Sequence, residues 1–141
     1  MNRTRILFDT DPGIDDAMAL AMLALDPRAE LVGITTVFGN VPIELTTRNA
    51  LALRERFGID HVPVARGAAR PLVKPAGDFA DFVHGANGLG NVALPEPSGA
   101  LDPRPAAQFI VVLARPRSGL LALAPLGPLT RLALALQGDQ A

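Results

Sequence analysis

The chain has 141 residues, no cysteine and a formal net charge of −1 at neutral pH. A chain of this length can bury roughly two-thirds of the surface that its unfolded form exposes, which is enough for one hydrophobic core. Without cysteine it has no disulfides and no thiolate chemistry, as in proteins of a reducing compartment, and its net charge gives no electrostatic reason to bind nucleic acid or an anionic membrane.

No part of the sequence has the form of a signal peptide or a membrane-spanning helix. The apolar stretch near the amino terminus is interrupted by Asp9, which comes too early for a signal peptide. The longest other apolar run, residues 17–25, ends at Asp26 and is too short to cross a bilayer. We therefore expect a cytoplasmic protein that is neither secreted nor inserted into a membrane.

Short apolar runs alternate with helical patterns along the chain. The expected strands cover residues 6–10, 30–37, 62–65 and 120–124, and the expected helices cover residues 16–25, 43–57, 105–114 and 129–136. Between residues 67 and 102 glycine and proline replace the regular pattern, so we expect a loop excursion there. The alternation predicts an α/β fold with a mostly parallel sheet, right-handed crossovers and flanking helices.

The first expected strand runs into a cluster of carboxylates. Four of the fourteen acidic residues lie within eight consecutive positions: Asp9, Asp11, Asp15 and Asp16. Between them Pro12-Gly13 forces a turn, after which Asp15 or Asp16 is expected to cap the next helix. Capping explains one aspartate or two, and carboxylates this close repel one another unless a cation or a polar ligand lies among them. The cluster therefore indicates a hard-metal site at the carboxyl edge of a sheet.

Other motifs compete for the same residues. An EF-hand counted from Asp9 would need a glutamate at its twelfth position, which is Leu20, so an EF-hand is rejected. A phosphate-binding loop is rejected because the turn carries negative charge instead of a lysine. The serious rival is an Asp-x-Asp phosphotransfer site with Asp9 as nucleophile and Asp11 as acid and base, which resembles the haloacid dehalogenase-like phosphatases.

Three residues outside the acidic turn are further candidates, and each has an ordinary structural explanation. Asn40 follows the second strand at the same sheet edge, where it either binds a sugar hydroxyl or serves as a turn residue. His84 lies in a glycine-rich segment and is either a proton donor or base contact, or a simple loop histidine. The carbonyl of Leu126 either ligates a cation or belongs to a strand-ending turn.

The run Asp9-Thr10-Asp11-Pro12-Gly13-Ile14-Asp15-Asp16-Ala17 resembles the signature of the inosine-uridine-preferring nucleoside hydrolases. Further segments of the family pattern follow in order: residues 35–41, 47–50, 84–85, 88–90 and 126–130. The similarity extends from Arg5 to about Leu136, and the order of these segments makes coincidence improbable. The resemblance implies a Rossmann-like nucleoside hydrolase fold. Residues 1–141 would be the N-terminal part of a single such domain.

The resemblance implies hydrolysis of the N-glycosidic bond of ribonucleosides to ribose and free base, with a bound calcium ion. The matched positions make Asp11, Asp16 and the main-chain carbonyl of Leu126 the calcium ligands. Asp11 would also be the catalytic base that takes a proton from water. This chemistry is sensible, because one cation can acidify water and orient the ribose diol together.

The remaining matched residues would bind the substrate. Asp15 and Asn40 would hold the ribose hydroxyls, Asp9 would support the cluster, and His84 is the further catalytic candidate. The expected partner is a small ribonucleoside, without nucleic acid or membrane, and the family usually forms homo-oligomers. Two alternatives stay open beside this hypothesis: the phosphatase-like Asp-x-Asp hydrolase, and a non-catalytic remnant that binds metal or nucleoside.

The chain departs from the family pattern in three ways. Family members are typically about twice as long, and their last calcium aspartate and its neighbouring histidine belong to the C-terminal half, so we expect an incomplete site here. Asn87 stands where an acidic residue is common. Arg131 stands where asparagine is usual, and we expect this change to alter only helix capping or a local contact.

Overall fold

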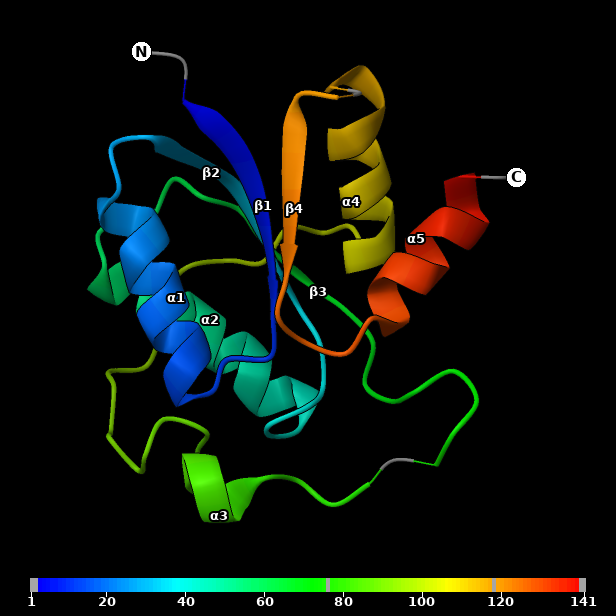
Figure 1. The fold of residues 1–141 in the computed structure, drawn as a ribbon. Helices are drawn as coiled ribbons and strands as arrows, with labels where there is room; N and C mark the ends of the chain where they lie inside the picture. The colour runs from blue at the N-terminus through cyan, green and yellow to red at the C-terminus, as the bar shows by residue number, and fades with distance from the viewer. Residues whose placement is uncertain (1–2, 76, 118, 140–141) are drawn as a thin grey trace.

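The structure is a computed structural model that describes residues 3–75, 77–117 and 119–139. Its centre is a four-stranded sheet in the order β3-β2-β1-β4, and every pair of neighbouring strands is parallel (Figure 1). The strands are β1 (Thr4–Thr10), β2 (Ala29–Thr36), β3 (Val64–Arg66) and β4 (Leu121–Pro125). The α/β fold with a parallel sheet is therefore confirmed.

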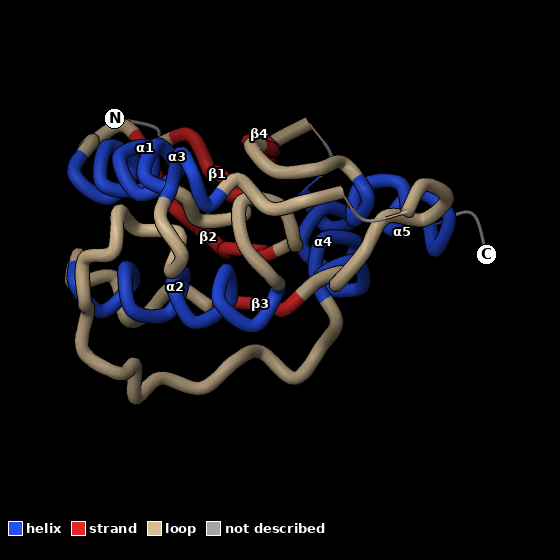
Figure 2. Tube along the Cα trace, turned by 90° about the horizontal axis from the view of Figure 1, so that it is seen from below, coloured by secondary structure: helices blue, strands red, loops and turns tan. Residues whose placement is uncertain are grey.

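Helices cover both faces of the sheet (Figure 2). They are α1 (Ile14–Leu25), α2 (Ile43–Arg56), α3 (Asp81–His84), α4 (Ala106–Ala114) and α5 (Thr130–Asp139), with a short 3-10 turn (Arg115–Arg117) after α4. Every expected strand and helix is present, with ends shifted by a few residues. The four-residue helix α3 was not expected, because it lies inside the glycine-rich excursion.

Alternation along β1 divides the core between the two faces. Phe8 packs in a cluster with Leu20 of α1 and residues of α2, whereas Leu7 packs on the other face with Phe109 of α4 and residues of α5. Gly33 of β2 leaves room for α4 on this second face, since a Cβ at Gly33 would lie 2.6 Å from the ring of Phe109. The sheet is thus buried on both sides, as parallel sheets are.

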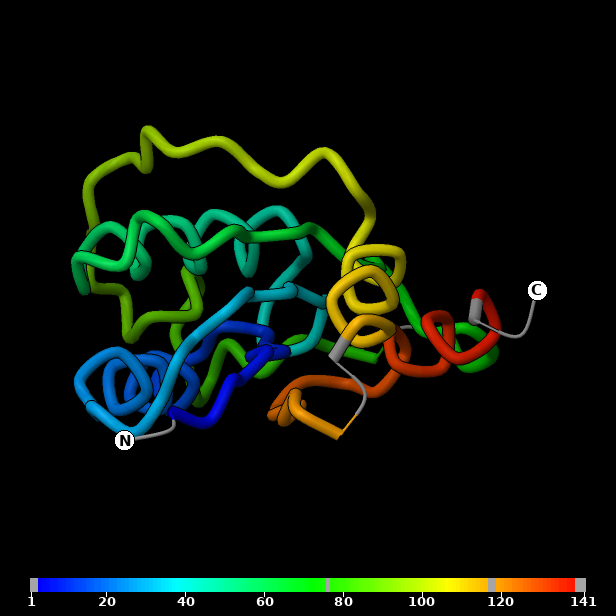
Figure 3. The backbone as a smooth tube through the Cα atoms, turned by 90° about the horizontal axis from the view of Figure 1, so that it is seen from above, coloured from blue at the N-terminus to red at the C-terminus, as the bar shows by residue number. Residues whose placement is uncertain are grey.

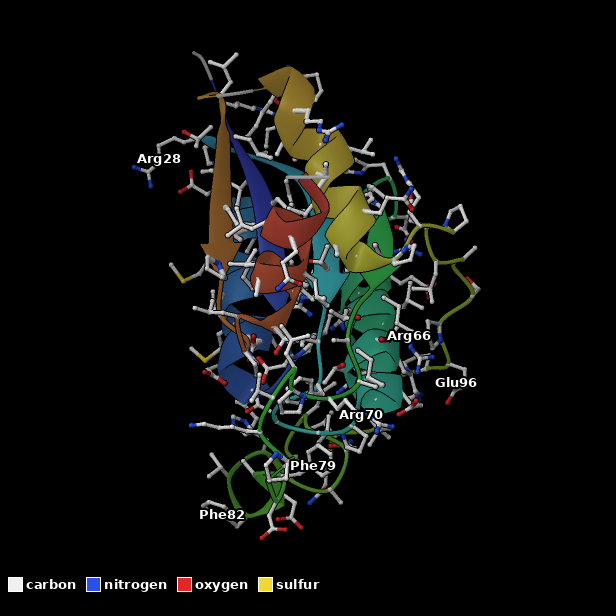
Figure 4. The ribbon with its side chains drawn as sticks, turned by 90° about the vertical axis from the view of Figure 1, so that its right-hand side faces the viewer. Arg28, Arg66, Arg70, Phe79, Phe82 and Glu96 are labelled. Carbon is white, nitrogen blue, oxygen red and sulfur yellow. The ribbon has the colours of Figure 1, made fainter. Side chains whose placement is uncertain are left out.

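The excursion between β3 and α4 passes beyond the carboxyl ends of the strands and then returns along α2. Figure 3 shows the returning part beside α2, and Figure 4 shows Phe79 and Phe82 at the far end of the excursion and Glu96 near α2. Arg48 of α2 forms a 2.6 Å ion pair with Glu96, and Glu55 accepts hydrogen bonds from the Ser98 and Gly99 amides at 2.8 and 2.7 Å. The expected loop excursion is therefore fastened to one helix.

Apolar side chains remain exposed on α1 and at the β4 edge of the sheet. Met18, Met22 and Leu25 are 65%, 71% and 82% exposed and form one stripe on α1. At the edge strand Leu123 is 38% exposed, and within the described chain β4 pairs only with β1. The α1 stripe and the β4 edge are suited to contact with another polypeptide. No helix in the described ranges is both long and apolar enough to cross a membrane.

We expect the chain to self-associate through the α1 stripe. In the double variant Met18→Glu/Met22→Glu, charge on the stripe should lower the weight-average mass measured by light scattering toward that of a monomer. The double variant Leu72→Glu/Val73→Glu is the control, because it charges two exposed apolar residues of the excursion and should leave the mass unchanged. A monomeric parent chain, or equal association of the parent and the α1 variant, would contradict this expectation.

Candidate active site

Asp9, the first carboxylate of the cluster, is buried beneath the sheet edge where the other candidate residues lie. Asp9 of β1 is fully buried, accepts a hydrogen bond from the Thr35 hydroxyl, and has Oδ2 2.6 Å from Nη2 of Arg131. Burial raises the pKa of Asp9, and the nearby positive charge opposes this rise. A carboxylate shut away from solvent and paired with a guanidinium is not placed to attack a phosphate ester. The Asp-x-Asp phosphatase alternative is therefore not supported.

Arg131 forms a buried ion pair that the sequence did not predict. We expected an effect on helix capping or a local contact, but the side chain is fully buried and crosses from α5 to Asp9. Gly67 gives it room, since a Cβ there would overlap Cδ of Arg131. Burial lowers the pKa of Arg131 while Asp9 raises it. The residue neutralises one of the four clustered carboxylates.

Asp16 is held inside the turn by three donors. It is 3% exposed, and its carboxylate accepts hydrogen bonds from the Thr10 hydroxyl, from the Gly13 amide at 3.2 Å and from Nδ2 of Asn40 at 3.2 Å. The N-cap of α1 is Gly13, and Asp16 reaches back to it from the third helical position. The expectation that Asp15 or Asp16 caps this helix is therefore confirmed for Asp16, which caps from the third helical position and not from the N-cap.

Asp11 lies beside Asp16, and within the described part of the chain no ion pair joins it to a cationic side chain. It is 6% exposed, and its Oδ2 accepts a hydrogen bond from the Asn40 amide at 2.9 Å. Burial raises the pKa of Asp11 to about 7, and the negative charge of Asp16 acts in the same direction. The pKa of Asp11 therefore lies near neutral pH, although the positive charge of Arg131 acts in the opposite direction.

Asn40 joins the two carboxylates. Its Nδ2 donates to the Asp11 carbonyl at 2.9 Å as well as to Asp16. Both hydrogens of Nδ2 therefore have acceptors within the turn, and Oδ1 is the atom that Asn40 can offer to a sugar hydroxyl. The sequence placed Asn40 at the correct sheet edge but did not predict that it orders the aspartates.

Two glycines allow other strand ends to approach Asp11. A Cβ at Gly39, after β2, would overlap Oδ2 of Asp11, and a Cβ at Gly127, after β4, would lie 2.9 Å from Oδ1. The neighbouring Leu126 amide donates to the Asp9 carbonyl at 2.8 Å. The peptide after Leu126 thus lies beside Asp11, and the role of the Leu126 carbonyl as a cation ligand stays a prediction.

The structure also brings His84 to the turn. The Ile14 amide donates to Nδ1 of His84 at 3.2 Å, so this nitrogen carries a lone pair and the neutral ring carries its hydrogen on Nε2. Oδ1 of Asp15 is 3.8 Å from the same Nδ1, beyond hydrogen-bond range, and its side chain is 75% exposed. His84 is only 12% exposed at its side chain, so the simple loop-histidine explanation does not describe it.

These contacts gather six candidates at one sheet edge: Asp11, Asp15, Asp16, Asn40, His84 and Leu126. The described residues contain no group of three or more His, Cys, Asp or Glu side chains placed to hold a metal ion. A cation here would have the carboxylates of Asp11 and Asp16 and would need main-chain or solvent oxygens in addition. Such an all-oxygen donor set fits calcium better than a softer metal.

Residues 6–141 match the protein-family model described as "inosine-uridine preferring nucleoside hydrolase". The chain belongs to this family. It is 48% identical to uridine nucleosidase 1 of Arabidopsis thaliana over 96% of its own length and 40% of that protein. It is 42% identical to the inosine-uridine preferring nucleoside hydrolase of Leishmania major, over 94% of its own length and 43% of that protein.

Solved structures of nucleoside hydrolases have the same fold. The plant enzyme PpNRh1 superposes with a TM-score of 0.92 at 36% identity, over 97% of this chain and 43% of that one. A purine-preferring ribonucleoside hydrolase from Gardnerella vaginalis gives 0.91 at 33% identity, over 95% and 43%. This member of the family thus spans about two-fifths of the length of these relatives.

The raised pKa of Asp11 predicts a pH-dependent cost to stability. Its pKa lies near 7 in the folded protein against an ordinary value of 3.8, so stability should fall as pH rises from about 4 to 7. Asp11→Asn removes the buried charge and keeps the acceptor for the Asn40 amide. By urea unfolding in EDTA, this variant should exceed the parent by about 1–4 kcal/mol at pH 8 and match it near pH 4.

Asp15→Asn is the matched control, because it removes an exposed carboxylate from the same turn. It should follow the parent at both pH values. Equal stability of Asp11→Asn and the parent at pH 8 would show that Asp11 bears no unbalanced charge.

Proposed function

We propose that this chain carries the cation- and ribose-binding part of an enzyme that hydrolyses the N-glycosidic bond of ribonucleosides to ribose and free base. One observation supports this most strongly: the buried carboxylates of Asp11 and Asp16 lie together, with Asn40 between them and no cationic side chain in contact with Asp11 among the described residues. The relatives whose names give an activity are nucleosidases or nucleoside hydrolases.

Calcium is the proposed cofactor. The donor set of Asp11, Asp16 and the nearby main-chain oxygens is hard and negatively charged, and Gly39 and Gly127 keep side chains away from Asp11. When bound, the ion would supply positive charge that acidifies water and orients the 2′- and 3′-hydroxyls of the ribose. We therefore propose that the chain recognises the ribonucleoside substrate mainly through its ribose.

Asp11 and His84 have the chemical roles in the proposed reaction. Asp11, with its pKa near 7, takes a proton from water as the water oxygen bonds to the anomeric carbon. The carbon–nitrogen bond breaks and its electron pair passes to the base, which must gain a proton. Solvent water supplies this proton, and the proton taken by Asp11 returns to solvent, so the carboxylate is restored. Nε2 of the neutral His84 ring carries a hydrogen, and we assign it a hydrogen bond to the base that stabilises the departing electron pair.

Asp15 and Asn40 are proposed to hold the sugar. The exposed carboxylate of Asp15 and Oδ1 of Asn40 can both accept hydrogen bonds from hydroxyls. Fixing the ribose places the anomeric carbon against the water and carboxylate, which accelerates the reaction by orientation. Negative charge around the ring also stabilises the oxocarbenium character of the transition state.

Calcium titration tests the proposal directly. Calorimetry should show that the parent chain binds calcium. Asp11→Asn and Asp16→Asn should each raise the dissociation constant at least ~10-fold, because each removes one carboxylate ligand. Asp60→Asn, which removes an exposed carboxylate elsewhere, should change nothing. Hydrolysis is measured as reducing sugar released from inosine and uridine, and the two site variants should abolish any calcium-dependent release. Calcium binding that is unchanged in both variants would refute the proposed site.

A further inference from the structure

Residues 84–92, here called the His84 loop, form a rigid unit. The side chain of Asn87 accepts hydrogen bonds from the Leu89 and Asn91 amides, both at 2.9 Å, and donates to the Val92 carbonyl at 2.9 Å. The Gly90 amide closes the loop on the His84 carbonyl at 2.7 Å. A group that holds Asn87 therefore also holds the backbone of His84.

Asn49 of α2 is such a group. It is fully buried, and its Nδ2 donates to the Asn87 carbonyl at 2.8 Å and lies 3.4 Å from the Pro12 carbonyl of the acidic turn. One amide thus links the His84 loop to the turn that carries Asp11 and Asp16. The contact is close, since a Cβ at Gly88 would lie 3.0 Å from Nδ2 of Asn49 and 3.1 Å from the Pro12 carbonyl oxygen.

The link costs stability in one respect. Oδ1 of Asn49 is buried without a hydrogen-bond partner among the described residues. A buried acceptor left unpaired is unfavourable, and an apolar side chain of the same shape would avoid that penalty. The advantage of an asparagine here lies in the two carbonyls that its Nδ2 brings together.

We propose that Asn49 is a positioning residue for the proposed hydrolysis, because it seats the His84 loop on the acidic turn and so aims His84. The Asn49 link works beside the direct contact from the Ile14 amide to Nδ1 of His84. Together the two contacts fix the loop at two points. The contact from the Ile14 amide also sets the His84 tautomer, because it leaves the ring hydrogen on Nε2. The inference rests on the proposed function for its catalytic meaning, but the positioning itself is measurable without substrate.

The test compares Asn49→Leu with Arg48→Gln by nitrogen-15 NMR of the whole chain. Arg48→Gln is the control, because Arg48 also ties the excursion to α2, through Glu96, but does not contact the turn. In Asn49→Leu the His84 ring should change from the Nε2–H form to a mixture of tautomers, and hydrogen exchange at the Ile14 amide should rise at least ~10-fold. Both signals should stay unchanged in Arg48→Gln, and the exposed His61 gives an internal reference.

The two signals separate positioning from a merely structural role. A structural role would lower the melting temperature of Asn49→Leu and leave the His84 tautomer and Ile14 exchange as in the parent, and that result would overturn the proposal. If Asn49→Leu does not fold, Gly88→Ala pushes the loop away from Asn49 at a residue with φ of +81°, where a side chain is strained. Gly88→Ala should give the same two changes, and their absence would equally overturn the proposal. Because neither readout needs calcium or hydrolysis, failure of the proposed function would leave this test intact.

Discussion

Negative charge buried at the end of β1 is the constraint on which the rest of the structure depends. Three carboxylates there are almost inaccessible to water, and each is treated differently. Asp9 is paired with Arg131, and Asp16 is surrounded by three hydrogen-bond donors. Burial and the like charge of Asp16 raise the pKa of Asp11 to about 7, although the Asn40 amide and the charge of Arg131 act in the opposite direction. Among the described residues Asp11 has no ion pair, and it is here that we propose the chemistry takes place.

The elements around this turn are arranged to hold it. β2 supplies Thr35 to Asp9 and ends just before Gly39 and Asn40, and β4 brings Gly127 against Asp11. Among the described residues no hydrogen bond or ion pair joins helix α2 to the three carboxylates, but α2 fastens both the His84 loop and the returning excursion. A long loop can therefore present a histidine at a defined place, although few of its residues are in regular structure. Such rigid support for a loop residue is what a catalytic group requires.

Much of this arrangement was predictable from the sequence because the relevant signals are local. The aspartates and Asn40 each follow an apolar strand, and parallel strands end at one edge of the sheet, so their proximity follows from topology. Arg131, Asn49 and the two glycines near Asp11 could not be found in this way. Their roles depend on which distant segment packs against them, and Arg131 meets Asp9 across more than one hundred residues of chain. The helix start was also misjudged, because Asp16 caps from within the first turn.

We propose that Asp11 bears a charge which a bound cation balances. Carbon-13 NMR of its carboxyl group through a pH titration measures this most directly, first in EDTA and then in saturating calcium. We expect a midpoint near pH 7 without calcium and a midpoint well below that value with calcium, because a bound cation favours the ionised form. A midpoint near 4 in EDTA, or the same midpoint in both conditions, would contradict it.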